Sequence, residues 1–245
     1  MDKTLIKGLR VLECVAGSSE PRGASDLAAE LGMTKSNAYR TLQTLVSMKF
    51  LHHRPGRGTY EPTLRLFELG MKVGGRLGVR TAALPILREL VERTGENASV
   101  AVLDDREVVY VERLDSPNPV RSVVRVGERL PAHCTAAGKA LLAWAPEEIV
   151  ESMAGLLHRH TEHTITDMEG LRAELACVRE TGFASARGEW HLTVTCVAVP
   201  VRNRSGEVIA AINVSGPTAR FGTAQMKKNA AAARWGAEQI LEQLT

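Results

Sequence analysis

Polar side chains gather on one side of the stretch from Thr34 to Leu45, and their types suit contact with nucleic acid. If this stretch is a helix, Ala38, Leu42 and Leu45 share one face at the spacing i, i+4, i+7. The opposite face carries hydroxyl, amide and guanidinium groups, which can reach phosphates and base edges in the major groove. These side chains belong to Ser36, Asn37, Arg40, Gln43 and Thr44. The pattern predicts a recognition helix.

A shorter helix must precede this one and hold it in place. Ser25 is predicted as the N-cap of that helix, and an apolar stripe runs along it to Leu31. Gly32 follows, where a left-handed residue is wanted after a helix end. Thr34 is predicted as the N-cap of the second helix, so the pair reads as a helix-turn-helix at about residues 25–45.

The segments around the helix pair complete a small domain. Residues 51–62 alternate basic residues with turn formers, which is typical of a hairpin wing. A first helix is expected over Thr4–Ala16, with Leu5, Leu9 and Leu12 on one side. Residues 1–63 are therefore predicted to form a winged helix-turn-helix domain. An ordinary helical hairpin with a solvated polar face is the competing interpretation.

Eleven residues of this domain are predicted to contact DNA, from the start of the first short helix to the wing. They are Ser25, Thr34, Lys35, Ser36, Asn37, Tyr39, Arg40, Gln43, Thr44, Arg54 and Arg57.

The distribution of charge supports this assignment. Residues 1–80 hold 13 Lys and Arg against 7 Asp and Glu, whereas the rest of the chain holds 18 against 21. The positive field therefore lies on the part that carries the candidate recognition helix.

Composition excludes several protein classes. A content of 44% hydrophobic and 24% charged residues is that of a globular protein with a sizeable core. No apolar run approaches the ~18–20 residues of a membrane span, and the N-terminus does not read as a signal peptide. The four cysteines include no CxxC pair, which favours reduced thiols and a cytoplasmic location.

The remaining sequence indicates a connecting helix and a second domain. Residues 64–80 are expected to form a linker helix that loosens into a hinge at its glycines. A helix over Ala82–Arg93, with Leu84, Leu87 and Leu90 on one side, then opens a domain over 81–245.

Alternating apolar residues in that second domain predict strands. They form a hairpin over 98–114, a third strand over 120–126 and two long strands in 194–201 and 208–215. Helices are expected over 135–144, 168–180 and 223–243. The predicted fold class is α+β, with an antiparallel sheet flanked by helices.

Three blocks of this second domain resemble a known family. LPAHCTAAGKALLA, GFASARGEWHLTVTCVAVPV and AAINVSGP are similar, in order and spacing, to the isocitrate lyase regulator (IclR) family of bacterial transcription factors. The resemblance covers essentially the whole chain. It implies a GAF-like effector-binding domain after the winged helix, an effector that is a small organic acid or aromatic metabolite, and assembly as dimers or dimers of dimers.

The resemblance also assigns effector-binding positions, and Thr135 is expected to cap the helix that begins at the pocket floor. Ala186 and Asn213 depart from some relatives. The expected pocket residues are Leu130, His133, Thr135, Ala136, Ala137, Glu189, Val194, Cys196, Asn213 and Ser215.

Other polar residues of the second domain have ordinary structural interpretations. Arg121, Arg125 and Arg187 could pair with a carboxylate, but arginines at sheet edges are usually solvated. Lys139 is expected either on the helix surface or beside an acid that it neutralises. Cys196 is read as a small buried hydrophobe.

Two alternatives to an effector-responsive regulator remain open. Cys134 and Cys196 could make a thiol sensor on the same frame, or a metal sensor together with His133 and His191, although the spacing is not that of a structural zinc motif. No metal ligand or cofactor is therefore assigned. An enzyme is not expected, because the sequence holds no nucleophile–base–orienter set and no phosphate loop. The expected partners are operator DNA, a small effector and a second copy of the chain.

Overall fold

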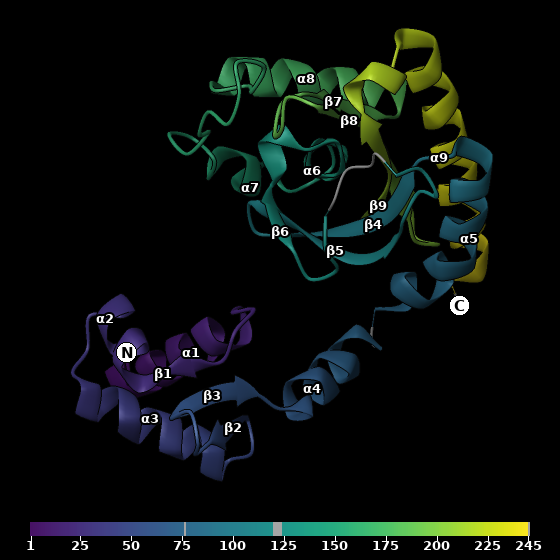
Figure 1. The fold of residues 1–245 in the computed structure, drawn as a ribbon. Coiled ribbons are helices and arrows are strands. Elements are labelled where there is room, and N and C mark those ends of the chain that lie inside the picture. The colour runs from purple at the N-terminus through teal and green to yellow at the C-terminus, as the bar shows by residue number, and fades with distance from the viewer. Residues whose placement is uncertain (76, 120–123, 245) are drawn as a thin grey trace. The chain divides into compact units, whose positions relative to one another are not determined.

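The computed structural model describes residues 1–75, 77–119 and 124–244, and the chain divides into two compact units (Figure 1). Unit 1 comprises Met1–Arg76, and unit 2 comprises Leu77–Thr245. Among the described residues, no helix has the length and apolar character needed to cross a membrane.

Unit 1 is a winged helix-turn-helix. Its strands form a three-stranded antiparallel sheet in the order β1-β3-β2, in which β2 and β3 make the hairpin wing. Its elements are α1 (Lys3–Ala16), β1 (Arg22–Gly23), α2 (Ala24–Glu30), α3 (Lys35–Ser47), β2 (Leu51–Arg54), β3 (Thr59–Pro62) and α4 (Leu64–Gly74).

The leucine side of the first helix is not the side that packs into the core. Leu5 and Leu9 are 61% and 50% exposed, whereas Val11 and Val15 are buried. Because each helical residue rotates the side chain by about 100°, the sequence offers two neighbouring apolar faces. Packing of α1 against α3 buries the valine face and leaves the leucines outside.

The predicted cap at Ser25 is wrong, because α2 begins two residues earlier than that cap implies, with Gly23 as its N-cap. Arg22 and Gly23 pair with β3, which keeps the backbone extended up to the start of the helix. Ser25 therefore lies in the first turn and is exposed. Gly32 has φ +61°, as expected for the left-handed residue after the helix.

Unit 2 contains a six-stranded antiparallel sheet in the order β6-β5-β4-β9-β8-β7. Its elements are α5 (Gly78–Thr94), β4 (Asn97–Asp104), β5 (Glu107–Leu114), β6 (Arg129–Pro131), the 3-10 helix η1 (Ala132–Cys134), α6 (Ala136–Leu142), α7 (Glu147–Glu151), α8 (Met168–Thr181), β7 (Ala184–Arg187), β8 (Val194–Arg202), β9 (Val208–Pro217), the 3-10 helix η2 (Thr218–Arg220) and α9 (Thr223–Gln243).

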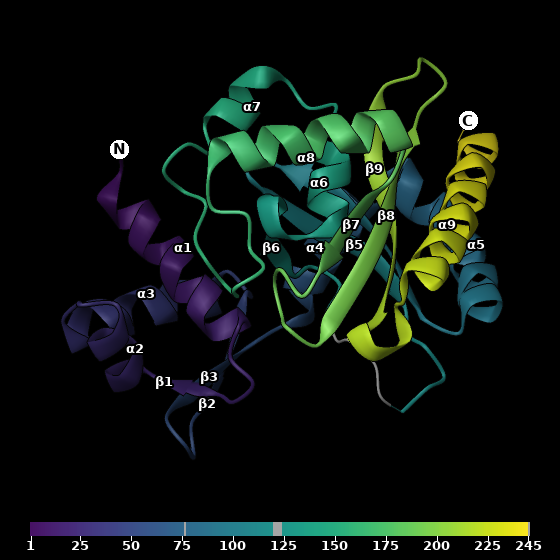
Figure 2. The same ribbon diagram turned by 90° about the horizontal axis from the view of Figure 1, so that it is seen from above.

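Helices cover both faces of this sheet, with α5 and α9 side by side on one face and α6 and α8 on the other (Figures 1 and 2). Successive side chains of β8 point alternately to the two faces of the sheet. Val197 and Val199 pack beneath α5 and α9, whereas Cys196 and Ala198 face α6. The alternation makes two apolar layers.

Two details of the second domain differ from expectation. The helix predicted at Ala82 begins at Gly78, and Leu84 is 41% exposed although Leu87 and Leu90 are fully buried. The predicted strand over 120–126 is not observed at 124–126, and residues 120–123 lie outside the described part of the chain. The outer strand that pairs with β5 is instead β6, and Gly127 makes a left-handed turn just before it.

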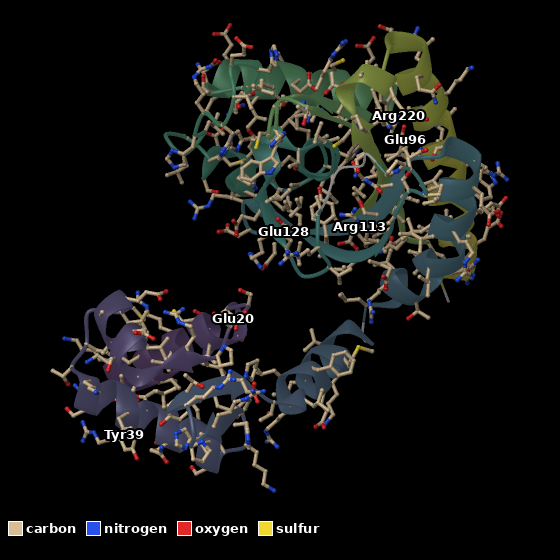
Figure 3. The ribbon with its side chains drawn as sticks, viewed as in Figure 1. Glu20, Tyr39, Glu96, Arg113, Glu128 and Arg220 are labelled. Atoms are coloured by element: carbon tan, nitrogen blue, oxygen red, sulfur yellow. The ribbon has the colours of Figure 1, made fainter. Side chains whose placement is uncertain are left out.

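Close packing of α6 fixes the position of its N-terminus. A Cβ added to Gly138 would lie 2.2 Å from the backbone oxygen of Ala132, so only glycine fits there. Lys139 follows and is 1% exposed, so its predicted place on the helix surface is wrong. Elsewhere in unit 2, Arg220 donates to both carboxylate oxygens of Glu96 at 2.6 and 2.7 Å (Figure 3).

Candidate functional site

The exposed side of α3 is determined by its cap and by its buried side. Thr34 Oγ1 accepts a hydrogen bond from the Asn37 backbone N–H at 3.3 Å, so Thr34 is the N-cap that the sequence predicts. Ala38 and Leu42 are fully buried. The polar side therefore faces solvent, and Tyr39 projects from it with 52% of its surface exposed (Figure 3).

All eleven residues predicted to contact DNA are exposed or half-buried in unit 1. Two of them have side-chain contacts with residues of the wing. Gln43 Nε2 donates to the hydroxyl of Tyr60 at 3.1 Å, which connects α3 to the wing. Arg54 forms an ion pair with Glu61 at 2.7 Å within the wing itself. These contacts hold both side chains in place beside the exposed face.

A hollow lies between α1 and α3, and Arg40 is on its wall. Arg40 Nη2 donates to Asn37 Oδ1 at 2.5 Å, which orients the guanidinium along the helix. The hollow is lined by Thr4, Lys7, Asn37, Arg40, Thr41 and Thr44. Thr4 and Lys7 were not predicted, because only the packing of α1 brings them beside the recognition helix.

In unit 2 a cavity of about 40 Å³ lies between the sheet and the start of α6. Cys196 of β8 pairs with Ser215 of β9, and Asn213 is two residues away on the same face. Seven of the ten expected pocket residues line the cavity: Leu130, Thr135, Glu189, Val194, Cys196, Asn213 and Ser215.

The other three expected residues lie elsewhere. His133 lines a second cavity, and Ala136 and Ala137 are buried in the apolar layer around α6. The reason is the direction of η1 and α6, which turns these side chains away from the first cavity. Sequence reasoning missed six lining residues, and the available signal was that Trp190 directly follows Glu189 and Cys134 directly precedes Thr135. The six are Tyr110, Val124, Cys134, Ala186, Trp190 and His191.

The candidate arginines do not line the first cavity where they are described. Arg125 and Arg187 are exposed, and Arg121 lies outside the described residues. Among the lining residues that the structure describes, His191 is the one side chain that can carry a positive charge.

Two acceptor oxygens of the cavity lining have no hydrogen-bond partner among the described residues. Asn213 Nδ2 donates to Ser99 Oγ at 3.2 Å, but its Oδ1 is buried and unpaired. Glu189 Oε1 accepts from Lys139, but Oε2 is likewise buried and unpaired. Both residues are at least nine-tenths buried. Because an unpaired buried acceptor costs free energy, the cavity is suited to a molecule with hydrogen-bond donors.

A buried ammonium group lies behind the Glu189 carboxylate. Lys139 Nζ is 2.8 Å from both Glu174 Oε1 and Glu189 Oε1. Burial raises the pKa of Glu189, and the adjacent ammonium opposes that shift. Neutralisation of an acid by Lys139, the second sequence interpretation, is therefore confirmed.

The cysteines of the lining are neutral thiols. Burial raises the pKa of Cys134 and of Cys196 to about 12, so neither is a thiolate at neutral pH. Since the thiolate is the reactive form, this environment does not favour a thiol sensor.

A group of possible metal ligands adjoins the first cavity. One ligand atom each of His133, Cys134 and His160 lies within 4.8 Å of the other two. The sequence alternative had paired His133 and Cys134 with Cys196 and His191, neither of which belongs to this cluster among the described residues.

Comparison with known proteins gives matches over both units. The family model described as IclR helix-turn-helix domain matches residues 4–55, and the model described as Bacterial transcriptional regulator IclR C-terminal matches residues 71–242. The HTH-type transcriptional regulator KdgR of Escherichia coli (strain K12) is 33% identical over 243 residues, which cover 98% of this chain and 92% of that protein.

Solved structures match over nearly the full chain. An IclR homolog from Microbacterium hydrocarbonoxydans, complexed with 4-hydroxybenzoate, has a TM-score of 0.87 and 31% identity over 99% of both chains. The Thermotoga maritima IclR has a TM-score of 0.81 and 27% identity, and the match covers 100% of this chain and 99% of that one.

Proposed function

The chain belongs to the IclR family of bacterial transcriptional regulators, and from that premise we propose how its two sites work together. The protein is a DNA-binding transcriptional regulator and not an enzyme, as its relatives are. In our proposal, the exposed side of α3 binds operator DNA and the first cavity of unit 2 binds a small organic effector. The observation that carries the effector assignment is the pair of unpaired acceptors in the cavity lining.

The DNA-binding part of the proposal rests on the polar side of α3. Arg40 and Asn37 lie one turn apart and are joined by a hydrogen bond, so both reach the same part of the groove. Lys7 of α1 adds a positive charge beside them. We expect base contacts from α3 and phosphate contacts from Lys7 and the wing.

Loss of Arg40 tests that assignment. Arg40→Ala is expected to weaken operator binding by roughly 1–3 kcal/mol if the guanidinium reads a base, and to reduce the salt slope if it holds a phosphate. The measurement is a titration of operator DNA at several salt concentrations, with Arg88→Ala on the exposed side of α5 as a matched control. Unchanged binding by folded Arg40→Ala would remove this residue from the interface.

The lining chemistry narrows the class of effector. Tyr110, Trp190 and Leu130 suit an apolar or aromatic body, whereas Glu189 and Asn213 call for hydroxyl or N–H donors. A small hydroxylated acid, aromatic or aliphatic, has both parts. The Microbacterium hydrocarbonoxydans relative is complexed with such a molecule, 4-hydroxybenzoate.

The two sites are coupled through a shift of populations in this proposal. An effector that prefers one arrangement of the chain changes the fraction that can bind DNA, and only differential affinity can do so. We assign residues 1–63 to DNA binding, 64–80 to the linker and 81–245 to effector binding, so the linker includes α4.

Self-association is part of the proposal, because two apolar faces of unit 1 are exposed. Leu5 and Leu9 on α1 have half or more of their surface exposed, as do Leu64 and Phe67 on α4. A second copy of the chain would cover such faces and present a second α3, at half-sites about 34 Å or a multiple apart. We place this assembly in the cytoplasm, where the four free cysteines stay reduced.

The experiment is a mobility-shift assay with DNA from just upstream of the protein's own gene, titrated with matched acids. A hydroxylated acid such as 4-hydroxybenzoate should alter the shift, and benzoate should do so about 1–3 kcal/mol less effectively because it leaves an acceptor unpaired. Asn213→Ala should narrow that difference. DNA binding that no acid changes would refute the effector assignment, and no DNA binding would refute the whole proposal.

A further inference from the structure

His133, Cys134 and His160 come together although 25 residues separate the first two from the third. His133 and Cys134 end the 3-10 helix η1, and His160 lies in the segment between α7 and α8. Imidazole nitrogen and thiolate sulfur are the ligands that zinc prefers in proteins. One ligand atom of each residue lies within 4.8 Å of the other two, so a shift of about 1 Å reaches tetrahedral spacing.

The hydrogen bond of His133 uses one ring nitrogen and leaves the other available as a ligand. His133 Nε2 is 3.1 Å from the backbone oxygen of His158. A carbonyl oxygen only accepts, so Nε2 carries the proton and Nδ1 keeps its lone pair. Metal-binding histidines usually donate their other N–H to a carbonyl or carboxylate in this way, which fixes the ring. His133 is also buried, with 2% of its surface exposed, so the surrounding core holds the ring in place.

The three ligands differ in burial in a way that gives an ion access. Cys134 and His133 lie inside, and His160 is exposed, with its ring centroid 4.3 Å from that of Trp190. The second cavity opens beside them, and its lining includes His158 and Met153, which are also nitrogen and sulfur donors. His133 and His160 line this second cavity, whereas Cys134 lines the first, so the cluster lies between the two.

We propose that His133 Nδ1, Cys134 Sγ and His160 form a zinc-binding site, with the fourth position open to water or a further donor from the second cavity. Zinc replaces the thiol proton of Cys134, which is released to solvent. His160 makes the shift that brings the three ligand atoms to tetrahedral spacing, because His160 is exposed whereas His133 and Cys134 are buried.

This site adjoins the effector cavity. Cys134 lines that cavity, and the next residue, Thr135, caps α6. A bound ion would hold the wall between the two cavities at the start of α6. The proposal itself does not depend on the effector or on DNA binding, because its test uses neither.

Zinc titration of the full chain without a polyhistidine tag tests the proposal. We expect one ion per chain by calorimetry, and Co²⁺ in place of zinc should show sulfur-to-cobalt absorption. His160→Ala should weaken zinc binding by tenfold or more and leave the fold unchanged, because this residue is exposed. Cys134→Ser should abolish the sulfur-to-cobalt band.

A matched control lies three residues further along the same segment. His163 is exposed and outside the cluster, so His163→Ala should bind zinc as the unchanged chain does. Equal weakening by His160→Ala and His163→Ala would indicate non-specific binding to a histidine-rich surface and overturn the site. Absence of one-to-one binding, or of the sulfur-to-cobalt band in the unchanged chain, would overturn it as well.

Discussion

Unit 1 has most of its polar side chains on the surface, whereas unit 2 also buries polar side chains in its interior. Every polar or charged side chain that is buried, among the described residues, belongs to unit 2. Unit 1 instead has a small core of Val11, Val15, Leu27, Leu42, Leu51 and Tyr60, and its other described polar side chains are exposed or half-buried. A unit that binds DNA presents polar groups on its surface, whereas a unit that encloses a small molecule places polar atoms in its interior.

The ion pairs of the two units differ in the same way. Arg22 pairs with Glu30 on the surface of unit 1, where water and salt screen the charges. Lys139 pairs with Glu189 in the interior of unit 2, where each charge depends on the other. Substitutions of interior polar groups should therefore have the larger effects.

Lys139→Met is expected to have the largest effect of the substitutions considered. It leaves the carboxylate of Glu189 buried without its cation, and removal of one partner from a buried pair costs about 3–5 kcal/mol. Denaturant unfolding of the full chain measures it. Lys72→Met, the same change on the exposed part of α4, is the matched control and should change stability by less than about 0.5 kcal/mol.

A second variant checks the cause. Lys139→Met combined with Glu189→Gln should recover part of the lost stability, because no uncompensated charge is then buried at that position. A double variant less stable than Lys139→Met alone would contradict this explanation, and the two units would then differ less than we argue.

Leu42→Ala tests whether the small core of unit 1 is the main source of its stability. Leu42 is fully buried among six core residues, and large-to-small changes at such positions cost about 2–5 kcal/mol. We expect unit 1 to unfold at lower denaturant concentration while unit 2 is unaffected. Amide hydrogen exchange measures the protection of each unit. Tyr39→Ala on the exposed side of α3 serves as the control. Equal loss of protection in both units would show that they unfold together.

The two threonine caps allow the same change to be made in both units. Thr34→Ala and Thr135→Ala each remove an N-cap hydrogen bond, worth about 1 kcal/mol. Thr135→Ala should cost more, because Thr135 is 4% exposed and its hydroxyl also donates to the Pro131 oxygen. Denaturant midpoints measure both, and serine at either position should restore most of the loss. A larger effect of Thr34→Ala would reverse the comparison.

Glu30→Gln should have the smallest effect. The Arg22 guanidinium lowers the pKa of Glu30, so the pair stabilises the fold above the ordinary carboxyl range and loses that contribution as pH falls through the lowered pKa. The carboxylate is on the surface, and salt should weaken the effect further. Thermal unfolding of both proteins from neutral to acidic pH measures it. A large difference at neutral pH would mean that this surface pair behaves like an interior one.

Local patterns predicted most of the elements, because caps, turn residues and apolar periodicity act over a few residues. Thr34, Gly32 and Thr135 have the roles that the sequence indicates. The sequence did not show which side of α1 is buried, because Leu5 and Val11 lie on two neighbouring apolar sides and only packing against α3 selects one of them. The cap at Ser25 was wrong for a similar reason, because pairing of β1 with β3 moved the helix start.

The sequence alone determined most of the elements, the two-part organisation and the exposed polar side of α3, because neighbouring residues decide these features. Only the tertiary structure decided which polar atoms meet. Lys139 and Glu189 are 50 residues apart, and His133 and His160 lie in different segments. Such contacts depend on how α6 packs between the sheet and α8, and no local spacing encodes that packing. The contacts between buried polar groups in unit 2 were therefore visible only in the tertiary structure, whereas the sequence already predicted the exposed polar side of α3 in unit 1.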